Sequence, residues 1–440
     1  MRRSVILIVI ALMGASLAAV VPARADGRVG RYIVVLNPGA GDPGSVAAEH
    51  ANEHSAVVTH LYRYALRGYA AAIPDARLDD VKSDPRVAYV SEDGTVEASH
   101  HRSGHGGGPP QPSPSPTPTT SPSPSPTPTE PASTQSLPTG INRIDGELSS
   151  ATSGDGSGMV EVDVAVIDTG IDLDHPDLNV HSAGGKNCTT SSGFDDANGH
   201  GTHVAGTIGA LDNTSGVVGV APGARVWPVR VLDRRGSGSW SWVICGIDWV
   251  TEHKDSIEVA NMSLGGSGSE PSDPDFDCVT GNALHDAICR SVTAGVTYAV
   301  AAGNESTNAA TRVPASFNEV ITVSALADFN GLPDGGGSPT CRSDVDDTFA
   351  DFSNFGADVD LIAPGVCINS TWMGGGYKSI SGTSMAAPHV AGAAALYSAA
   401  NPGATPQQVQ AALQAGGTDE WVTTSDRDPV HEPLLNVDLL

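Results

Sequence analysis

Six short runs of consecutive apolar residues, separated by stretches with helical spacing, constrain the fold of this chain most. They span 162–167, 226–231, 259–262, 296–301, 320–323 and 359–362. Because these runs are continuously apolar rather than apolar at alternate residues, we expect strands of a parallel sheet buried on both faces. With helices between the strands, the pattern predicts a doubly wound, mostly parallel α/β fold for a main domain over 135–440.

A smaller α/β module is predicted over residues 26–99. Strand-like runs and helical stretches follow one another in the order βαββαβ, which is typical of a ferredoxin-like fold. The strands are expected at 32–36, 61–66, 69–73 and 87–90, and the helices at 45–58 and 76–82.

Residues 100–134 join the two predicted domains. Their composition changes to Gly and then to alternating Ser-Pro and Thr-Pro. Such a segment cannot bury a core, and its prolines favour extended polyproline II. We interpret it as a stiff linker in preference to a ligand for a Pro-rich-binding domain.

The first 25 residues (1–25) have the pattern of a signal peptide. Arg2 and Arg3 precede an apolar run from Val5 to Val21, and Ala23-Arg24-Ala25 supplies the small residues of a cleavage site. The run is short for a membrane span, so we predict cleavage and secretion in preference to an uncleaved anchor.

Composition excludes several partners. The formal net charge of −27 argues against binding to nucleic acid or to an anionic membrane surface. An exported chain can form disulfides, and the six cysteines are an even number that allows many pairings. Short spacing favours only one of these pairs, Cys278 with Cys289.

Three motifs place an acid, a base and a nucleophile at the ends of predicted elements. Asp168 follows the apolar run 162–167, at the strand end where parallel sheets form ligand sites. His200 and Ser384 each begin a predicted helix, in Asn-Gly-His-Gly-Thr-His and Gly-Thr-Ser-Met-Ala-Ala-Pro. Asp, His and Ser in this order can form a triad in which His200 takes the proton of Ser384 and Asp168 orients His200.

Each of these residues alone has an ordinary interpretation. A strand-end Asp is commonly a turn residue, and a Ser at a helix start is commonly an N-cap. His203 or His389 could be taken for the base, and His200 with His203 for metal ligands. The occurrence of all three motifs in one chain favours the triad.

With these motifs, most of residues 138–440 resemble the subtilisin-like serine proteases (subtilases, peptidase family S8). Short loops after Asn304 and around Pro314 resemble the proteinase K type. The resemblance implies a Ser-His-Asp endopeptidase in which the Asn304 side chain and the Ser384 N–H bind the oxyanion. We expect a secreted, monomeric enzyme that acts on proteins or peptides.

The resemblance also implies two glycine-rich edges that hold a substrate as an added strand. The residues carried over for these edges are Ser263, Leu264, Gly265 and Gly266 on one side, and Gly236, Ser237 and Gly238 on the other. Trp240 and Leu264 are expected to line an apolar pocket for the residue four places before the cut. Glu305 either favours a basic residue before the cut or is a solvated glutamate.

Residues 31–98 resemble, more weakly, the I9-type inhibitory propeptide of the same family. The resemblance implies a zymogen whose propeptide assists folding, inhibits the enzyme within the same chain and is removed autocatalytically. Members of the family usually have the propeptide joined closely to the enzyme, whereas here the linker 100–134 lies between them. The first cut is therefore expected near Ser99 or His100, with the linker retained or trimmed towards Gln135.

A structural Ca²⁺ site is a further implication. The residues that match the family's calcium loop are Gln135, Asp177, Leu211, Asn213, Ser215 and Val217. Calcium prefers carboxylate, amide and carbonyl oxygens, which this set supplies. An ordinary Asx turn is the alternative.

Two other functions fit parts of the sequence. His50, Glu53 and His54 fit the H-x-x-E-H pattern of a zinc peptidase, on a helix that looks exposed and has no evident third ligand. A subtilase fold kept only for binding is the other rival. An esterase of the α/β-hydrolase type is excluded because no G-x-S-x-G is present and the order of the triad differs.

Overall fold

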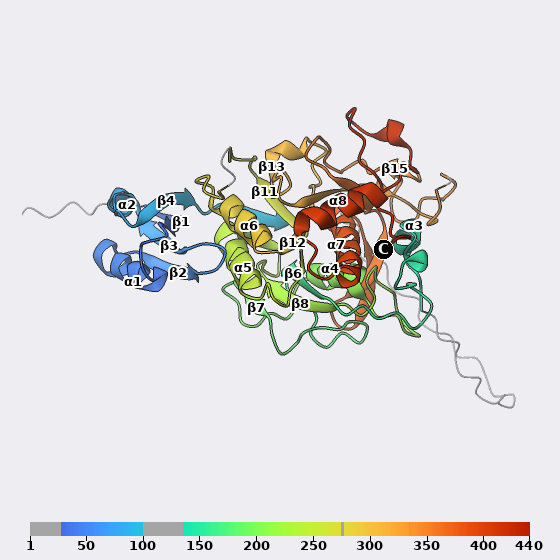
Figure 1. Cartoon of the computed structure of the whole chain (residues 1–440), viewed down its shortest axis with the longest axis horizontal. Coiled ribbons are helices and arrows are strands. Elements are labelled where there is room, and N and C mark those ends of the chain that lie inside the picture. Colours follow the sequence, from blue (N-terminus) through green and yellow to red (C-terminus); the bar gives the residue numbers. More distant parts are fainter. Residues whose placement is uncertain (1–27, 100–134, 274–276, 334) are drawn as a thin grey trace, which may run out of the picture.

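The computed structural model describes residues 28–99, 135–273, 277–333 and 335–440. These form a small N-terminal module beside a large domain (Figure 1). The predicted signal peptide and linker lie outside the described residues.

The predicted doubly wound parallel sheet is confirmed. Strand β6 (Asp163–Asp168) lies inside it, between β8 (Arg225–Arg230) and β10 (Val259–Met262), and pairs with both in parallel. The order is β7-β8-β6-β10-β12-β14-β15, with β16 also paired to β14, and only β15 is antiparallel. The remaining bounds are β7 Lys186–Asn187, β12 Thr297–Ala301, β14 Ile321–Ala327, β15 Thr348–Phe349 and β16 Leu361–Pro364.

Helices cover both faces of this sheet, as the continuous apolar runs require. Val164 and Val166 of β6 pack into one core and Ala165 and Ile167 into the other, because successive strand residues point to opposite faces. Helices α4 (His200–Gly209) and α7 (Thr383–Ala400) lie on the first face, and α5 (Trp240–Glu252) and α6 (Ala283–Thr293) on the second.

Shorter elements complete the large domain. They are α3 Thr139–Arg143, β9 Ser237–Ser239, β11 Leu264–Ser267, β13 Arg312–Val313, β17 Ile368–Trp372, β18 Gly376–Ile380 and α8 Pro406–Gly416, with 3-10 turns at Gly146–Leu148, Ala309–Thr311 and Thr423–Ser425. Helix α8 begins with a capping box in which Thr405 and Gln408 satisfy each other's backbone N–H groups.

The N-terminal module has the predicted βαββαβ order. Its antiparallel sheet runs β2-β3-β1-β4, and it packs against α5 and α6 of the large domain (Figure 1). The bounds are β1 Val29–Leu36, α1 Pro43–His54, β2 Val57–Tyr62, β3 Gly68–Pro74, α2 Asp75–Lys82 and β4 Val87–Glu92.

Two predicted boundaries in this module are wrong. The first helix ends at His54 rather than at residue 58, because Ser55 adopts a left-handed conformation with φ 56°. The β-branched residues that follow favour a strand, so β2 covers 57–62 rather than 61–66. A further strand, β5 (Thr95–Ala98), was not predicted as such and leaves the module altogether.

Three disulfides join the cysteines. Cys278 pairs with Cys289, as the spacing predicted. The other pairs are Cys188–Cys245 and Cys341–Cys367. None of the helices in the described part of the chain combines the length and apolarity that a membrane span needs.

Candidate active site

Asp168 and His200 form a buried pair at the carboxyl edge of the sheet. His200 Nδ1 lies 2.8 Å from Asp168 Oδ1 and 2.9 Å from Oδ2. Burial lowers the pKa of His200, but the charge of Asp168 and its hydrogen bond more than reverse this, so the pKa is raised. The pair therefore holds an imidazole in one tautomer, with Nδ1–H towards the carboxylate, and stabilises its protonated form.

The glycine before His200 sets the start of helix α4. Gly199 has φ 103°, and a Cβ at this position would come within 2.3 Å of the Trp372 ring. Only glycine accommodates both the conformation and the contact. The helix can thus begin at the residue that contacts Asp168.

The two histidines that could be taken for the base are fully buried and engaged elsewhere. His203 Nε2 lies 2.9 Å from the carbonyl of Ile368, and burial lowers the pKa of His203 to about 3. Burial likewise lowers the pKa of His389 to about 4, and its Nδ1 lies 2.8 Å from the Met385 carbonyl. Neither histidine approaches Asp168 as His200 does.

Ser384 lies in the first turn of α7. Its hydroxyl donates to the carbonyl of Ser263 at 3.0 Å, and its backbone N–H donates to the carbonyl of Ser99 at 3.2 Å. Ser99 is the last described residue of the N-terminal module. A carbonyl group of the chain itself is therefore held at the N-terminus of a helix, where N–H groups and the dipole favour negative charge.

Asn304 contacts the first turn of α7, next to Ser384. Its side-chain oxygen accepts from the backbone N–H of Thr383 at 2.9 Å and from the Thr383 hydroxyl at 3.1 Å. These bonds fix the orientation of the amide, so that its NH₂ group is the end left to donate. Asn304 lines the same cavity as Ser99, which suits an amide donor for an oxyanion.

Strand β5 lies between the two predicted glycine-rich edges. It pairs antiparallel with β11, where Leu264 faces Ala98 and Gly265 faces Glu97. It pairs antiparallel with β9 on its other side, at Gly238 and Ser237 among others. The Gly236 carbonyl and the Ser263 carbonyl extend this ladder by accepting from the N–H groups of Ala98 and Ser99. The structure thus brings all eight predicted substrate-binding residues around one extended segment.

Val96 fills the predicted apolar pocket. It is 1% exposed and packs in one cluster with Trp240 and Leu264. Val96 stands four places before the bond that follows Ser99, the position expected to enter this pocket. Glu97, next along the strand, is exposed.

Glu305 is paired within the cleft. Its Oε1 lies 2.9 Å from a guanidinium nitrogen of Arg312, and its Oε2 accepts from the Asn354 amide at 2.9 Å. Glu305 and Arg312 line the cavity of about 480 Å³ that also contains Ser99. The glutamate is therefore neither a lone negative charge nor simply solvated.

The N-terminal module docks through polar contacts that the sequence analysis missed. Four consecutive backbone N–H groups, of residues 63–66, donate to the carboxylate of Asp248 in α5 at 2.8–3.4 Å. Asp93 caps the start of α5 through Ser241, with bonds of 2.9 and 2.8 Å. Aspartates that face helix starts or turns give no distinctive sequence pattern, so only the docked structure identifies them.

The six residues of the predicted calcium loop also meet. Gln135 Nε2 donates to the carbonyls of Leu211 and Val217 at 2.7 and 3.0 Å, and Gln135 Oε1 accepts from the Asn213 N–H at 3.0 Å. Asp177 accepts from the Asn213 amide at 2.9 Å and from the Val217 N–H at 3.0 Å. The Ser215 N–H donates to the Asn213 side-chain oxygen at 2.6 Å. This set supplies carboxylate, amide and carbonyl oxygens around the buried Asp177, which fits calcium.

The H-x-x-E-H histidines do not form a metal pair. His50 is buried, contrary to the expectation of an exposed helix face, because α1 packs it against β3. Its Nδ1 contacts the Tyr69 hydroxyl and its Nε2 lies 3.0 Å from Asp84. With both ring nitrogens of His50 engaged, the zinc-peptidase alternative has no support.

Comparison with known protein families gives two matches. Residues 160–427 match the model of the subtilase family, and residues 31–99 match that of the peptidase inhibitor I9. The second match ends at Ser99, the residue whose carbonyl contacts Ser384.

Individual proteins support the same grouping. Subtilisin E of Bacillus subtilis (strain 168) is 36% identical over 371 residues, which cover 83% of this chain and 79% of that protein. An extracellular serine proteinase of Thermus sp. (strain Rt41A) is 36% identical over 421 residues, covering 90% and 87%. A solved structure, described as a cold adapted subtilisin-like serine proteinase, matches with a TM-score of 0.54 and 35% identity over 68% of this chain and 97% of that one.

Proposed function

The chain belongs to the subtilase family and is a serine-type endopeptidase with an I9-type propeptide, and we propose that it is secreted and matures itself by cutting after Ser99. Secretion is supported by the signal-peptide pattern at 1–25 and by the extracellular relative. The assignment to the proteinase K type stays a prediction.

The observation that carries the proposal of self-cleavage is the contact between Ser99 and Ser384. The module enters the cleft as a strand that is antiparallel to both edges, and its last carbonyl lies on the Ser384 N–H at 3.2 Å. A chain bound in this way presents the bond after Ser99 to the proposed nucleophile.

In the proposed reaction, Ser384 Oγ forms a bond to the Ser99 carbonyl carbon while its proton passes to His200 Nε2. Asp168 holds the imidazole through Nδ1 and stabilises its positive charge. The Ser384 N–H and the Asn304 amide stabilise the oxyanion, a contribution of about 10²–10³ in turnover for one such donor. His200 then gives its proton to the departing amine of residue 100, and water hydrolyses the acyl-enzyme.

After the cut, the same contacts make the module an inhibitor. Residues 95–99 remain between β9 and β11, and the aspartate contacts on α5 hold the rest of the module in place. The cleft becomes available to other protein or peptide substrates only when this product leaves or is degraded.

We propose Ca²⁺ as a structural ion at the Gln135–Asp177 loop. The Asp177 carboxylate, the two amide side chains and the backbone carbonyls of Leu211 and Val217 would hold it. When bound, the ion would neutralise the buried Asp177 carboxylate and tie residue 135 to the loop 211–217. It takes no part in the peptide-bond chemistry.

The test is the intact mass and N-terminal sequence of the secreted wild type beside Ser384→Ala. We expect the wild type to lose the residues up to Ser99 while the variant keeps them. Identical cutting of both chains would show that another protease matures the protein. Absence of cutting in both would contradict self-cleavage.

A further inference from the structure

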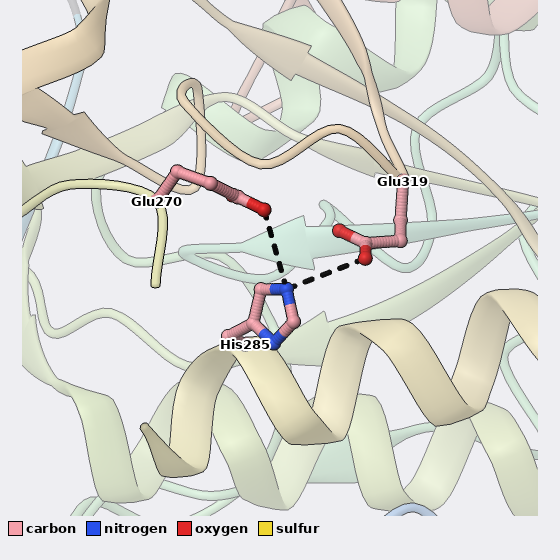
Figure 2. Close-up of side chains that lie close together, drawn as sticks. All are labelled: Glu270, His285 and Glu319. Atoms are coloured by element: carbon pink, nitrogen blue, oxygen red, sulfur yellow. Dashed lines mark ion pairs between the residues drawn. The ribbon is translucent and has the colours of Figure 1, made fainter. Parts of the chain in front are cut away.

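Away from the cleft, three side chains from separate segments meet at the N-terminal turn of α6 (Figure 2). His285 Nε2 lies 3.6 Å from Glu270 Oε1 and 3.3 Å from Glu319 Oε1. Donor atoms of the three residues all lie within 4.8 Å of one another. Both glutamates point their carboxylates towards the same ring nitrogen (Figure 2).

The histidine at the centre of this group is completely buried and lacks a hydrogen bond on that side. His285 is 0% exposed, and its Nε2 makes no contact of hydrogen-bond geometry within the described residues. The Oε2 atoms of Glu270 and Glu319 are likewise buried without a hydrogen bond among these residues, whereas Glu270 Oε1 accepts from the Asn318 amide at 3.1 Å. Because buried polar atoms are almost always hydrogen-bonded, a buried Nε2 that faces two carboxylates without a hydrogen bond calls for a bound group.

The negative charge around His285 indicates that the bound group is a cation. Asp286 lies 3.5 Å from His285 Nδ1, and Asp273 lies close to Glu319. In the described part of the chain, no lysine or arginine forms an ion pair with any of these four carboxylates, and His285 is their one possible cationic partner. Three carboxylates around one imidazole, with Asp273 beside Glu319, leave an excess of negative charge.

We propose that Glu270, His285 and Glu319 bind a Zn²⁺ ion. Zinc binds imidazole nitrogen and carboxylate oxygen at about 2.0–2.2 Å, and tetrahedral geometry then separates neighbouring ligand atoms by about 3.4 Å. The observed separations of 3.3 and 3.6 Å match this value. Calcium prefers six to eight oxygen ligands and fits an imidazole poorly.

The other side of the histidine ring supports the same assignment. Metal-binding histidines usually direct their second nitrogen at a carboxylate, which fixes the tautomer. His285 Nδ1 lies 3.5 Å from both the Asp286 carboxylate and the Thr280 hydroxyl. Cys289, although close to Glu319, is bonded to Cys278 and supplies no thiolate.

Such an ion would join three segments of the large domain. Glu270 follows β11, the strand that pairs with the substrate segment, while Glu319 precedes β14 and His285 lies in α6. Zinc at this position would stabilise the connection behind the substrate-binding strand. It lies outside the catalytic group and does not depend on the proposed self-cleavage.

The experiment uses the full-length Ser384→Ala chain, so that no proteolysis occurs. The protein is stripped of metal, calcium is added in excess to fill oxygen-only sites, and Zn²⁺ or Co²⁺ is titrated. We expect one tightly bound ion per chain, and for Co²⁺ the intense visible bands of a tetrahedral site.

Glu319→Gln and Glu270→Gln, which keep the side-chain shape, should each weaken zinc binding by at least about tenfold. Glu161→Gln, at an exposed glutamate, is the matched control. Replacing the linker histidines His100, His101 and His105 by Ala controls for binding there and should leave the tight site intact. Absence of a stoichiometric site, tight binding that survives Glu319→Gln, or binding lost with the linker histidines would overturn the proposal. The comparison requires that the Glu319→Gln chain folds correctly, which circular dichroism of the metal-free protein checks.

Discussion

The carbonyl oxygen of Ser99 accepts a hydrogen bond from the backbone N–H of Ser384 at 3.2 Å, across the boundary between the N-terminal module and the large domain. Ser99 follows a strand held on both sides by the cleft, and Ser384 lies in the first turn of a helix. The contact places a peptide carbonyl where helix N–H groups favour negative charge. The N-terminal module, the substrate cleft and the proposed nucleophile therefore meet at this one hydrogen bond.

Ser384→Ala is expected to lower turnover of a peptide substrate by about six orders of magnitude, because the triad acts as a unit. To supply mature protein, the variant is cut after Ser99 by added wild-type enzyme, which is then removed. Ser398→Ala, on the same helix and away from the cleft, is the control and should keep full activity. A rate for Ser384→Ala near that of the wild type would contradict the assignment of the nucleophile.

Activity should fall as the pH drops, with a midpoint above the ordinary histidine value of 6.5. Burial lowers the pKa of His200, and Asp168 more than reverses this, so the net shift is upwards. The base accepts a proton only when it is neutral, so kcat/KM is full above the raised pKa and is lost below it. The profile of kcat/KM from pH 5 to 9 measures the midpoint, and a flat profile from pH 5 to 8 would exclude His200 as the base.

The apolar pocket around Val96 predicts a preference four residues before the cut. Peptides with Val-Glu-Ala-Ser before the scissile bond reproduce the chain's own sequence at 96–99. Replacing Val by Ala removes two buried methyl groups, about 1.6 kcal/mol, and should lower kcat/KM about tenfold. Replacing Glu by Gln at the exposed next position is the matched control and should change little. Equal rates for the Val and Ala peptides would mean that the pocket does not act on substrates.

The ion pair in the cleft predicts that the enzyme does not prefer a basic residue before the cut. Glu305 is already paired with Arg312 at 2.9 Å. Arg312→Gln should unpair the glutamate and raise kcat/KM for Lys or Arg relative to Ser at this position. The expected factor is about twofold to fivefold, the strength of a partly exposed ion pair. A strong preference for basic residues in the wild type would contradict this interpretation.

Much of this arrangement could be predicted from the sequence, and the rest depends on docking. Continuous apolar runs indicated the parallel sheet because burial on both faces leaves that pattern, and β10 has the predicted bounds, Val259–Met262. The hydrogen bonds from the backbone N–H groups of residues 63–66 to the Asp248 carboxylate could not be predicted, because they form only when the N-terminal module is in contact with the large domain. The partner of Glu305 was also undetermined, because Arg312 is brought beside it only by the loop geometry.

Removal of calcium should destabilise the enzyme without directly abolishing its chemistry. A ligand present at 100 times its dissociation constant stabilises the folded state by about 2.7 kcal/mol, which for a domain of this size lowers Tm by about 4 °C on removal. Asp177→Asn should reproduce most of this loss, because Asp177 supplies the one carboxylate of the set, whereas Asp255→Asn, at an exposed site, should not. Adding Ca²⁺ alone to the metal-stripped protein separates this ion from zinc at Glu270, His285 and Glu319, since calcium fits an imidazole site poorly. An unchanged Tm after calcium removal, or an immediate loss of turnover at a temperature far below Tm, would contradict a purely structural calcium ion at this loop.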